Sequence, residues 1–110
     1  METTMFNALR HALQKARFKR RGLLIIQAIP ADTFATILDE YQARGWELTD
    51  AYRAFSAEQP RWRGVLRKGT GQLRCEWTAD RTGSMVGIAR IVNGVASEYN
   101  LTADASPSKG

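Results

Sequence analysis

The chain is poor in the residues that carry most metal-binding and imidazole chemistry, since its 110 residues include 1 cysteine and 1 histidine. One cysteine excludes a disulfide framework and a site of several cysteine ligands, and one histidine excludes most imidazole-based catalytic designs. Long hydrophobic runs are also missing: the longest, Leu23–Ile26, has the length of a strand and is too short to span a membrane. The first residues lack an uninterrupted apolar stretch with a cleavage site, so we expect a cytoplasmic protein.

What is present is the composition of an ordinary globular domain, with 44% hydrophobic and 25% charged residues. A chain of this length buries about two-thirds of its unfolded surface, so it can fold without a disulfide or a metal ion. We therefore expect one soluble domain.

Positive charge is concentrated at the N-terminus. The net charge is +5, and residues 1–21 hold six Lys and Arg against Glu2, whereas the remaining residues hold equal numbers of cations and carboxylates. Four apolar residues of this segment fall on one face of a predicted helix over residues 3–17: Met5, Phe6, Leu9 and Leu13. We therefore predict a basic amphipathic arm over residues 1–21, which is typical of proteins with anionic partners.

A strand followed by a helix is predicted directly after the arm. Residues 23–29 are almost continuously apolar and rich in isoleucine, which indicates a central strand ended by Pro30. Apolar residues then recur with helical spacing over 32–44, at Phe34, Ile37, Leu38 and Tyr41. Asp32 is a candidate N-cap, and Gly45 followed by Trp46 is typical of a left-handed C-terminal cap.

Strand patterns follow in series. Residues 46–55 mix aromatic and β-favouring residues, and residues 61–68 and 72–79 alternate apolar with polar side chains across a short link at 69–71. Residues 85–102 fit either a helix or a hairpin. The Asn93-Gly94 pair, a type I′ turn signal between β-branched residues, favours the hairpin.

These elements predict an α+β fold: an antiparallel β-meander with helix 32–44 packed on one face, preceded by the basic N-terminal helix. The domain is expected to cover residues 22–102, and residues 103–110, which are small and polar, are expected to form a disordered tail.

Part of this pattern resembles a known family. Within residues 23–68, the family-like positions are Tyr41, Gly45, Trp46, Glu47 and Leu48. They resemble a small bacterial domain family of unknown function, in which a strand and a helix lead into a Gly-Trp-Glu-Leu segment and a hairpin that ends in basic residues. The resemblance implies a bacterial or phage origin and a strand–helix–strand order, but no activity, substrate or catalytic residue.

Residues for catalysis are sparse. Cys75 alternates with Leu73 and Trp77 on the apolar face of its strand, so we expect it to be buried, and His11 lies in the arm. No glycine pattern matches a phosphate loop, and no spacing assembles a metal site. We therefore predict a protein that is not an enzyme and has no cofactor and no metal.

Two basic surfaces remain as candidate binding sites. The first is the arm, through Arg10, Lys15, Arg17, Lys19, Arg20 and Arg21. The second is the polar face of the sheet, where register could align Arg53, Arg61, Arg63, Arg67 and Arg74. The alternative for the sheet face is neutralisation by cross-strand pairs to Glu47 and Glu76. The three tryptophans are expected in the core rather than as base-stacking platforms.

The favoured hypothesis is a small binding module whose arm contacts an anionic partner, nucleic acid first and an acidic protein surface second. The alternative is an inhibitor, accessory or assembly subunit that docks the stripe Met5, Phe6, Leu9 and Leu13 into a partner groove. Attachment of the same helix to a membrane surface is a third possibility, which its short apolar face fits less well. The sequence does not indicate an oligomeric state.

Overall fold

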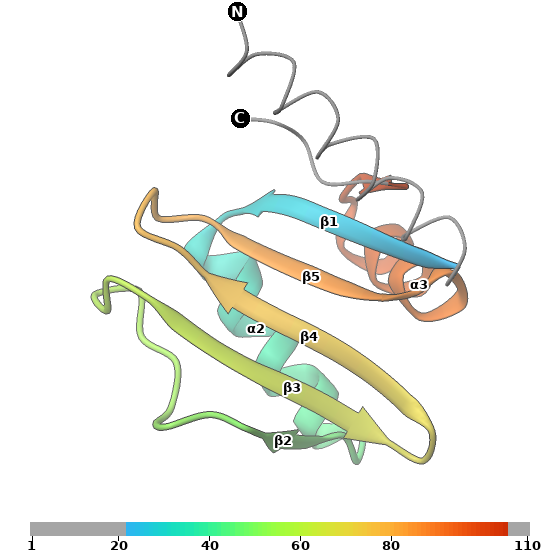
Figure 1. Ribbon diagram of the computed structural model, residues 1–110, viewed down its shortest axis with the longest axis horizontal. Coiled ribbons are helices and arrows are strands. Elements are labelled where there is room, and N and C mark those ends of the chain that lie inside the picture. Colours follow the sequence, from blue (N-terminus) through green and yellow to red (C-terminus); the bar gives the residue numbers. More distant parts are fainter. Residues whose placement is uncertain (1–21, 106–110) are drawn as a thin grey trace, which may run out of the picture.

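Residues 22–105, the part of the chain that the computed structural model describes, form an antiparallel sheet with two helices on one face (Figure 1). Along the chain the elements are β1 (Leu23–Ile29), α2 (Ala31–Ala43), β2 (Glu47–Thr49), β3 (Trp62–Lys68), β4 (Gly71–Trp77), β5 (Gly83–Ile88), α3 (Ala89–Tyr99) and β6 (Ala103–Asp104). The strands lie in the order β2-β3-β4-β5-β1-β6. The predicted α+β class and antiparallel sheet are confirmed, while the predicted N-terminal helix lies outside the described residues.

Strands β2 to β5 form the predicted meander, each beside the next. The hairpin between β3 and β4 pairs Lys68 with Gly71, which leaves a two-residue loop. In this loop Gly69 has a φ of +59°, whereas Thr70 has no positive φ. A type II′ turn has this pattern, because it needs a positive φ only at its first central residue.

The core lies between the sheet and the helices. Alternation along β3 and β4 directs their buried residues, Trp62, Leu66, Leu73, Cys75 and Trp77, to the helix side. At one end, the ring of Phe34 from α2 packs against the rings of Phe55, Trp62 and Trp77, with centroids 4.9, 6.0 and 5.8 Å away. Trp62 and Trp77 are therefore core residues, as expected.

Helix α2 ends as its sequence predicts. Gly45 has a φ of +98°, and its N–H donates to the carbonyl of Gln42, while the N–H of Trp46 donates to the carbonyl of Tyr41. These two hydrogen bonds define a Schellman motif, and the Trp46 ring packs 5.5 Å from the Tyr41 ring. The predicted capping role of Asp32 is wrong: Pro30 is the N-cap residue, with no side-chain cap.

The hairpin favoured for residues 85–102 is wrong, because most of this segment, Ala89–Tyr99, is helix α3. Ile91, Val92 and Val95 are buried on one side of α3, which packs on β1 and β5. Asn93 and Gly94 face solvent in the middle of the helix rather than forming a turn. Burial of the apolar stripe therefore outweighs the local turn preference of the Asn-Gly pair.

Two further strands differ from the predictions. The strand expected over 46–55 is limited to β2, because Asp50 adopts a left-handed φ of +59° and the chain turns out of the sheet. Ala103 and Asp104, predicted to lie in a tail, form β6 beside β1. Strand β1, as predicted, lies inside the sheet, but β6 covers only its middle.

The two helices are joined to each other by side-chain contacts. The Arg44 guanidinium at the end of α2 binds both carboxylate oxygens of Glu98 on α3, with an Nη1–Oε1 distance of 2.8 Å. The Tyr99 hydroxyl donates a hydrogen bond of 2.7 Å to Glu40. In the described part of the chain, neither helix has the length and apolarity needed to cross a membrane.

Candidate functional site

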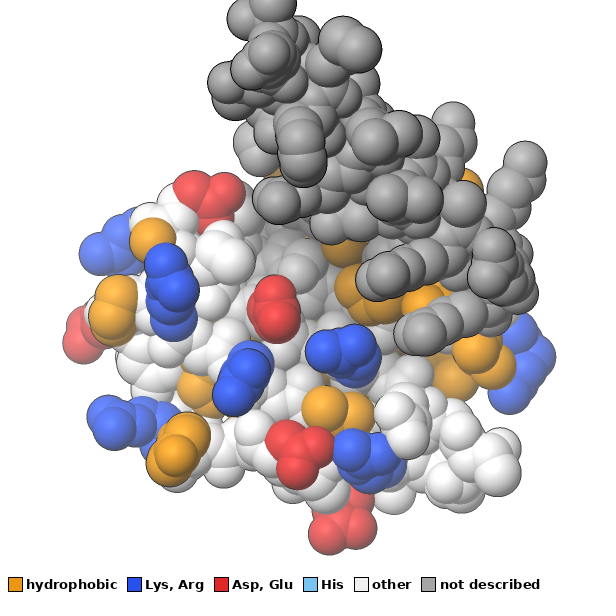
Figure 2. Space-filling view, viewed as in Figure 1, with side chains coloured by type: hydrophobic (Ala, Val, Ile, Leu, Met, Phe, Trp, Pro, Cys, Tyr) orange, Lys and Arg blue, Asp and Glu red, His pale blue; other side chains and the backbone are white. Residues whose placement is uncertain are grey.

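The sheet face opposite the helices carries the charged side chains of β3 and β4. Alternation places Arg63, Arg67, Arg74 and Glu76 on this face, because their neighbours along each strand point to the core. Figure 2 views the molecule from this side and shows basic and acidic side chains interspersed over it. We call this surface the open face.

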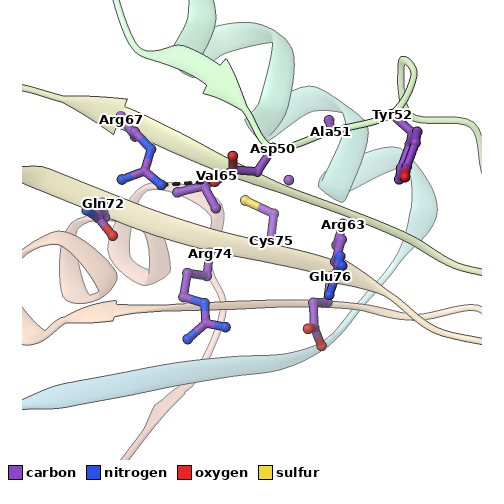
Figure 3. Close-up of a pocket in the computed structure, with 11 residues that line it drawn as sticks. Asp50, Ala51, Tyr52, Arg63, Val65, Arg67, Gln72, Arg74, Cys75 and Glu76 are labelled. Carbon is purple, nitrogen blue, oxygen red and sulfur yellow. Dashed lines mark hydrogen bonds and ion pairs between the residues drawn. The ribbon is translucent and has the colours of Figure 1, made fainter.

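A cavity of about 740 Å³ lies on the open face, between β3, β4 and the turn that follows β2. Its lining includes three arginines, two carboxylates and one tyrosine: Arg63, Arg67, Arg74, Asp50, Glu76 and Tyr52 (Figure 3). We call it the arginine cavity. Its volume lies within the range of roughly 300–1,000 Å³ that is usual for small-ligand sites.

One of the three arginines, Arg67, is held in place. Its Nη2 lies 2.9 Å from Asp50 Oδ2, and its Nε donates to Thr49 Oγ1, also at 2.9 Å. The left-handed turn at Asp50 brings this carboxylate back over β3. The positive charge of Arg67 is therefore partly neutralised, and its guanidinium is fixed at one end of the arginine cavity.

The other two arginines, Arg63 and Arg74, form no ion pair or side-chain hydrogen bond with any described residue. Arg74 lies between Val65 and Val86, which offer its guanidinium no acceptor. Arg63 lies opposite Glu76 in the register, yet the two side chains form no ion pair. Both guanidinium groups are thus available to an external anion.

The structure does not contain the neutralising cross-strand pairs that were the sequence-based alternative. Glu47 lies opposite Arg67 in the register, but Arg67 pairs with Asp50 instead. The expected alignment of five arginines is met in part. Arg63, Arg67 and Arg74 share the arginine cavity, whereas Arg53 and Arg61 line a neighbouring cavity of about 990 Å³, which Arg63 and Tyr52 also border.

Sequence reasoning missed two residues of the site, Asp50 and Tyr52. Both belong to the segment predicted as a strand, in which Tyr52 would be one β-favouring residue among several. The sequence feature that could have placed Asp50 and Tyr52 outside a strand is the short polar run around Asp50, which is typical of a turn. The arm residues predicted to bind anions, and the apolar stripe of the predicted helix, lie outside the described residues.

Cys75 borders the arginine cavity but does not offer a nucleophile. Its side chain is fully buried, and its Sγ lies 3.4 Å from the carbonyl oxygen of Leu73. Burial raises the pKa of the thiol to about 12, which disfavours the reactive thiolate. Among residues 22–105, no cluster of three His, Cys, Asp or Glu side chains could hold a metal ion.

Comparison with known proteins finds no relative: no family model matches the chain, and no significant match exists among curated proteins or solved structures. The resemblance of residues 23–68 to a small bacterial family therefore stays a prediction.

Proposed function

We propose that this protein is a small, non-enzymatic binding module whose anionic partner is nucleic acid, bound across the open face. The observation that carries the proposal is the pair of guanidinium groups of Arg63 and Arg74, which have no ion-pair partner among the described residues, beside the anchored Arg67. Guanidinium groups match phosphate oxygens in a bidentate geometry, which makes arginine the preferred residue for phosphate contacts.

The basic arm is assigned a supporting role in this proposal. Six of its twelve residues from 10 to 21 are Lys or Arg, and the arm continues directly into β1 at Gly22. Cations tethered to the start of β1, in the same sheet, would raise the local affinity for a polyanion and speed its encounter with the open face.

An acidic protein surface is the second candidate partner. The observation that favours it is the presence of Asp50 and Glu76 among the arginines, because a face of mixed charge can pair with both signs on a folded partner. A nucleic acid offers only negative charge, so the two candidates respond oppositely when Glu76 is neutralised.

The test is the binding of fluorescently labelled oligonucleotides, duplex and single-stranded, to the full chain over a salt series. We expect log K to fall against log salt with a slope of about −3 to −5, because each phosphate contact releases about one counterion. The double variant Arg63→Gln/Arg74→Gln should reduce the magnitude of this slope by about 1.5–2. Glu76→Gln should strengthen binding, because it removes a carboxylate that repels phosphate.

The control is Arg90→Gln, which removes one positive charge of the same kind from α3, on the other side of the sheet. It should leave the slope unchanged. A second variant, with the six arm cations replaced by Gln and the apolar stripe kept, measures the contribution of the arm. The proposal would be overturned if binding were weak, insensitive to salt, and the same in the Arg63→Gln/Arg74→Gln variant and in the arm variant. Weaker binding by Glu76→Gln would also overturn it.

A further inference from the structure

Tyr52 differs from the other described aromatic residues because it packs against nothing. Its exposed fraction is 100%, and the only other exposed large hydrophobic residue among residues 22–105 is Ile88, at 42%. Phe34, Phe55 and the three tryptophans all pack in or against the core. Both ring faces of Tyr52 are therefore free to contact a ligand.

The backbone on either side of Tyr52 is tied to β3. The Asp50 carboxylate, two residues before it, binds Arg67, and the carbonyl of Arg53, directly after it, accepts a hydrogen bond of 2.7 Å from Trp62 Nε1. The ring is thereby positioned at the border between the arginine cavity and its neighbour. In Figure 3 it stands at the end of the cavity nearest Arg63.

The arginines and Tyr52 together match the two parts of a nucleotide. Arg63 and Arg74 occupy diagonal positions of paired strands, which are roughly 7–8 Å apart in general sheet geometry, so they can reach separate phosphates of one backbone. A planar ring beside them offers a stacking surface, which every nucleobase can use whatever its sequence.

We infer that the partner is a single-stranded nucleic acid, whose phosphates meet Arg63 and Arg74 while one base stacks on Tyr52. This inference rests on the proposed function and names its substrate class. A duplex suits the site less well, because its bases are already stacked and offer Tyr52 no free face. The described part of the open face is also a sheet surface without a helix or ribbon that would enter a major groove.

The experiment compares three full-length proteins, wild type, Tyr52→Ala and Tyr52→Phe, by fluorescence anisotropy on a 12-nucleotide oligo-dT, a 12-nucleotide oligo-U and a 12-base-pair duplex. Tyr52→Ala should weaken binding to both single strands about tenfold, which is the expected loss for one stacked base. Tyr52→Phe keeps the stacking ring and should stay within about twofold of wild type. Because Tyr52 is fully exposed, neither substitution should disturb folding.

Ile88→Ala is the matched control, since it trims the other exposed apolar side chain, which does not line either cavity. It should leave single-strand affinity unchanged. This inference would be overturned if Tyr52→Ala bound single strands as tightly as wild type, or lost equal affinity for duplex and single strands. In either case the proposed function would still stand if the Arg63→Gln/Arg74→Gln variant reduced the salt slope. Absence of binding to all three oligonucleotides would overturn both.

Discussion

Gly83 shows how one residue without a side chain sets the spacing between the sheet and α2. A Cβ built at this position of β5 would lie 2.2 Å from Cδ1 of Phe34, and the two next nearest atoms, at 2.6 and 2.8 Å, belong to the same ring. Phe34 cannot move away easily, because Phe55, Trp62 and Trp77 surround it. The absence of a side chain at Gly83 thus allows the aromatic end of the core to close on the sheet.

We therefore predict that Gly83→Ala lowers the free energy of unfolding by about 1–3 kcal/mol, the usual cost of overpacking a core site. Urea denaturation followed by tryptophan fluorescence measures this loss. In a Phe34→Leu background the same substitution should cost clearly less, because the clashing ring is gone. Equal losses in both backgrounds would show that the contact with Phe34 is not the cause.

Helix α3 shows which elements the sequence could predict and which it could not. Helix α2 and strands β3 and β4 carry periodic patterns that agree with the C-terminal cap of α2 and the turn at 69–71. Strand β1 is a nearly continuous apolar run ended by Pro30, so here too the local signals point to one structure. In α3 they conflict, because the Asn93-Gly94 turn signal lies inside the apolar stripe of a helix. Burial of the apolar stripe against β1 and β5 decides in favour of the helix. A short stretch of sequence cannot reveal this packing, because it depends on strands elsewhere in the chain.

This conflict can be measured at Gly94. The residue is exposed in the middle of α3, and a Cβ added there would meet no atom within 4 Å. We predict that Gly94→Ala raises the free energy of unfolding by about 0.5–1 kcal/mol, because alanine has the higher helix propensity. A type I′ turn at this position would give the opposite sign. Gly69→Ala is the matched control and should destabilise, because Gly69 has a φ of +59°.

The candidate site likewise has one part that the sequence predicts and one part that it does not. Strand alternation was sufficient to place Arg63, Arg67 and Arg74 on one polar face, and the structure confirms that placement. Pairing within that face was not predictable, because Asp50 reaches Arg67 only through a left-handed backbone conformation. The full exposure of Tyr52 depends on the same turn, which ends β2 early.

At the scale of the whole molecule, the two faces of the sheet differ in what they contribute to the core. The helix side holds the core together, and its two helices are joined by the Arg44–Glu98 ion pair and the Tyr99–Glu40 hydrogen bond. The open face carries the arginine cavity and contributes little to the core. We therefore predict that substitutions at the helix junction change stability, and that under the proposed function they leave nucleic-acid affinity unchanged. Substitutions in the arginine cavity should do the reverse.

The helix junction makes stability depend on pH in a defined direction. The hydrogen bond from Arg44 lowers the pKa of Glu98 below its ordinary value of 4.5. A group with a lowered pKa in the folded state stabilises the fold above its unfolded pKa, and this contribution is lost as the pH falls. We predict that wild type is more stable than Glu98→Gln at about pH 6, and that urea denaturation shows the difference shrinking toward about pH 3.

Tyr99 makes the stability of the fold depend on pH in the opposite direction, at high pH. Burial, followed by the hydrogen bond to Glu40, raises the pKa of its hydroxyl above the ordinary 10, so the neutral form stabilises the fold. That contribution is complete below about pH 10 and is lost as the pH rises further, whereas Tyr99→Phe should lack this alkaline loss.

If the difference in stability between wild type and Glu98→Gln were the same at every pH, the Arg44–Glu98 pair would not couple protonation to folding. The helices would then be held by the Tyr99–Glu40 hydrogen bond and by the packing of their buried residues on the sheet.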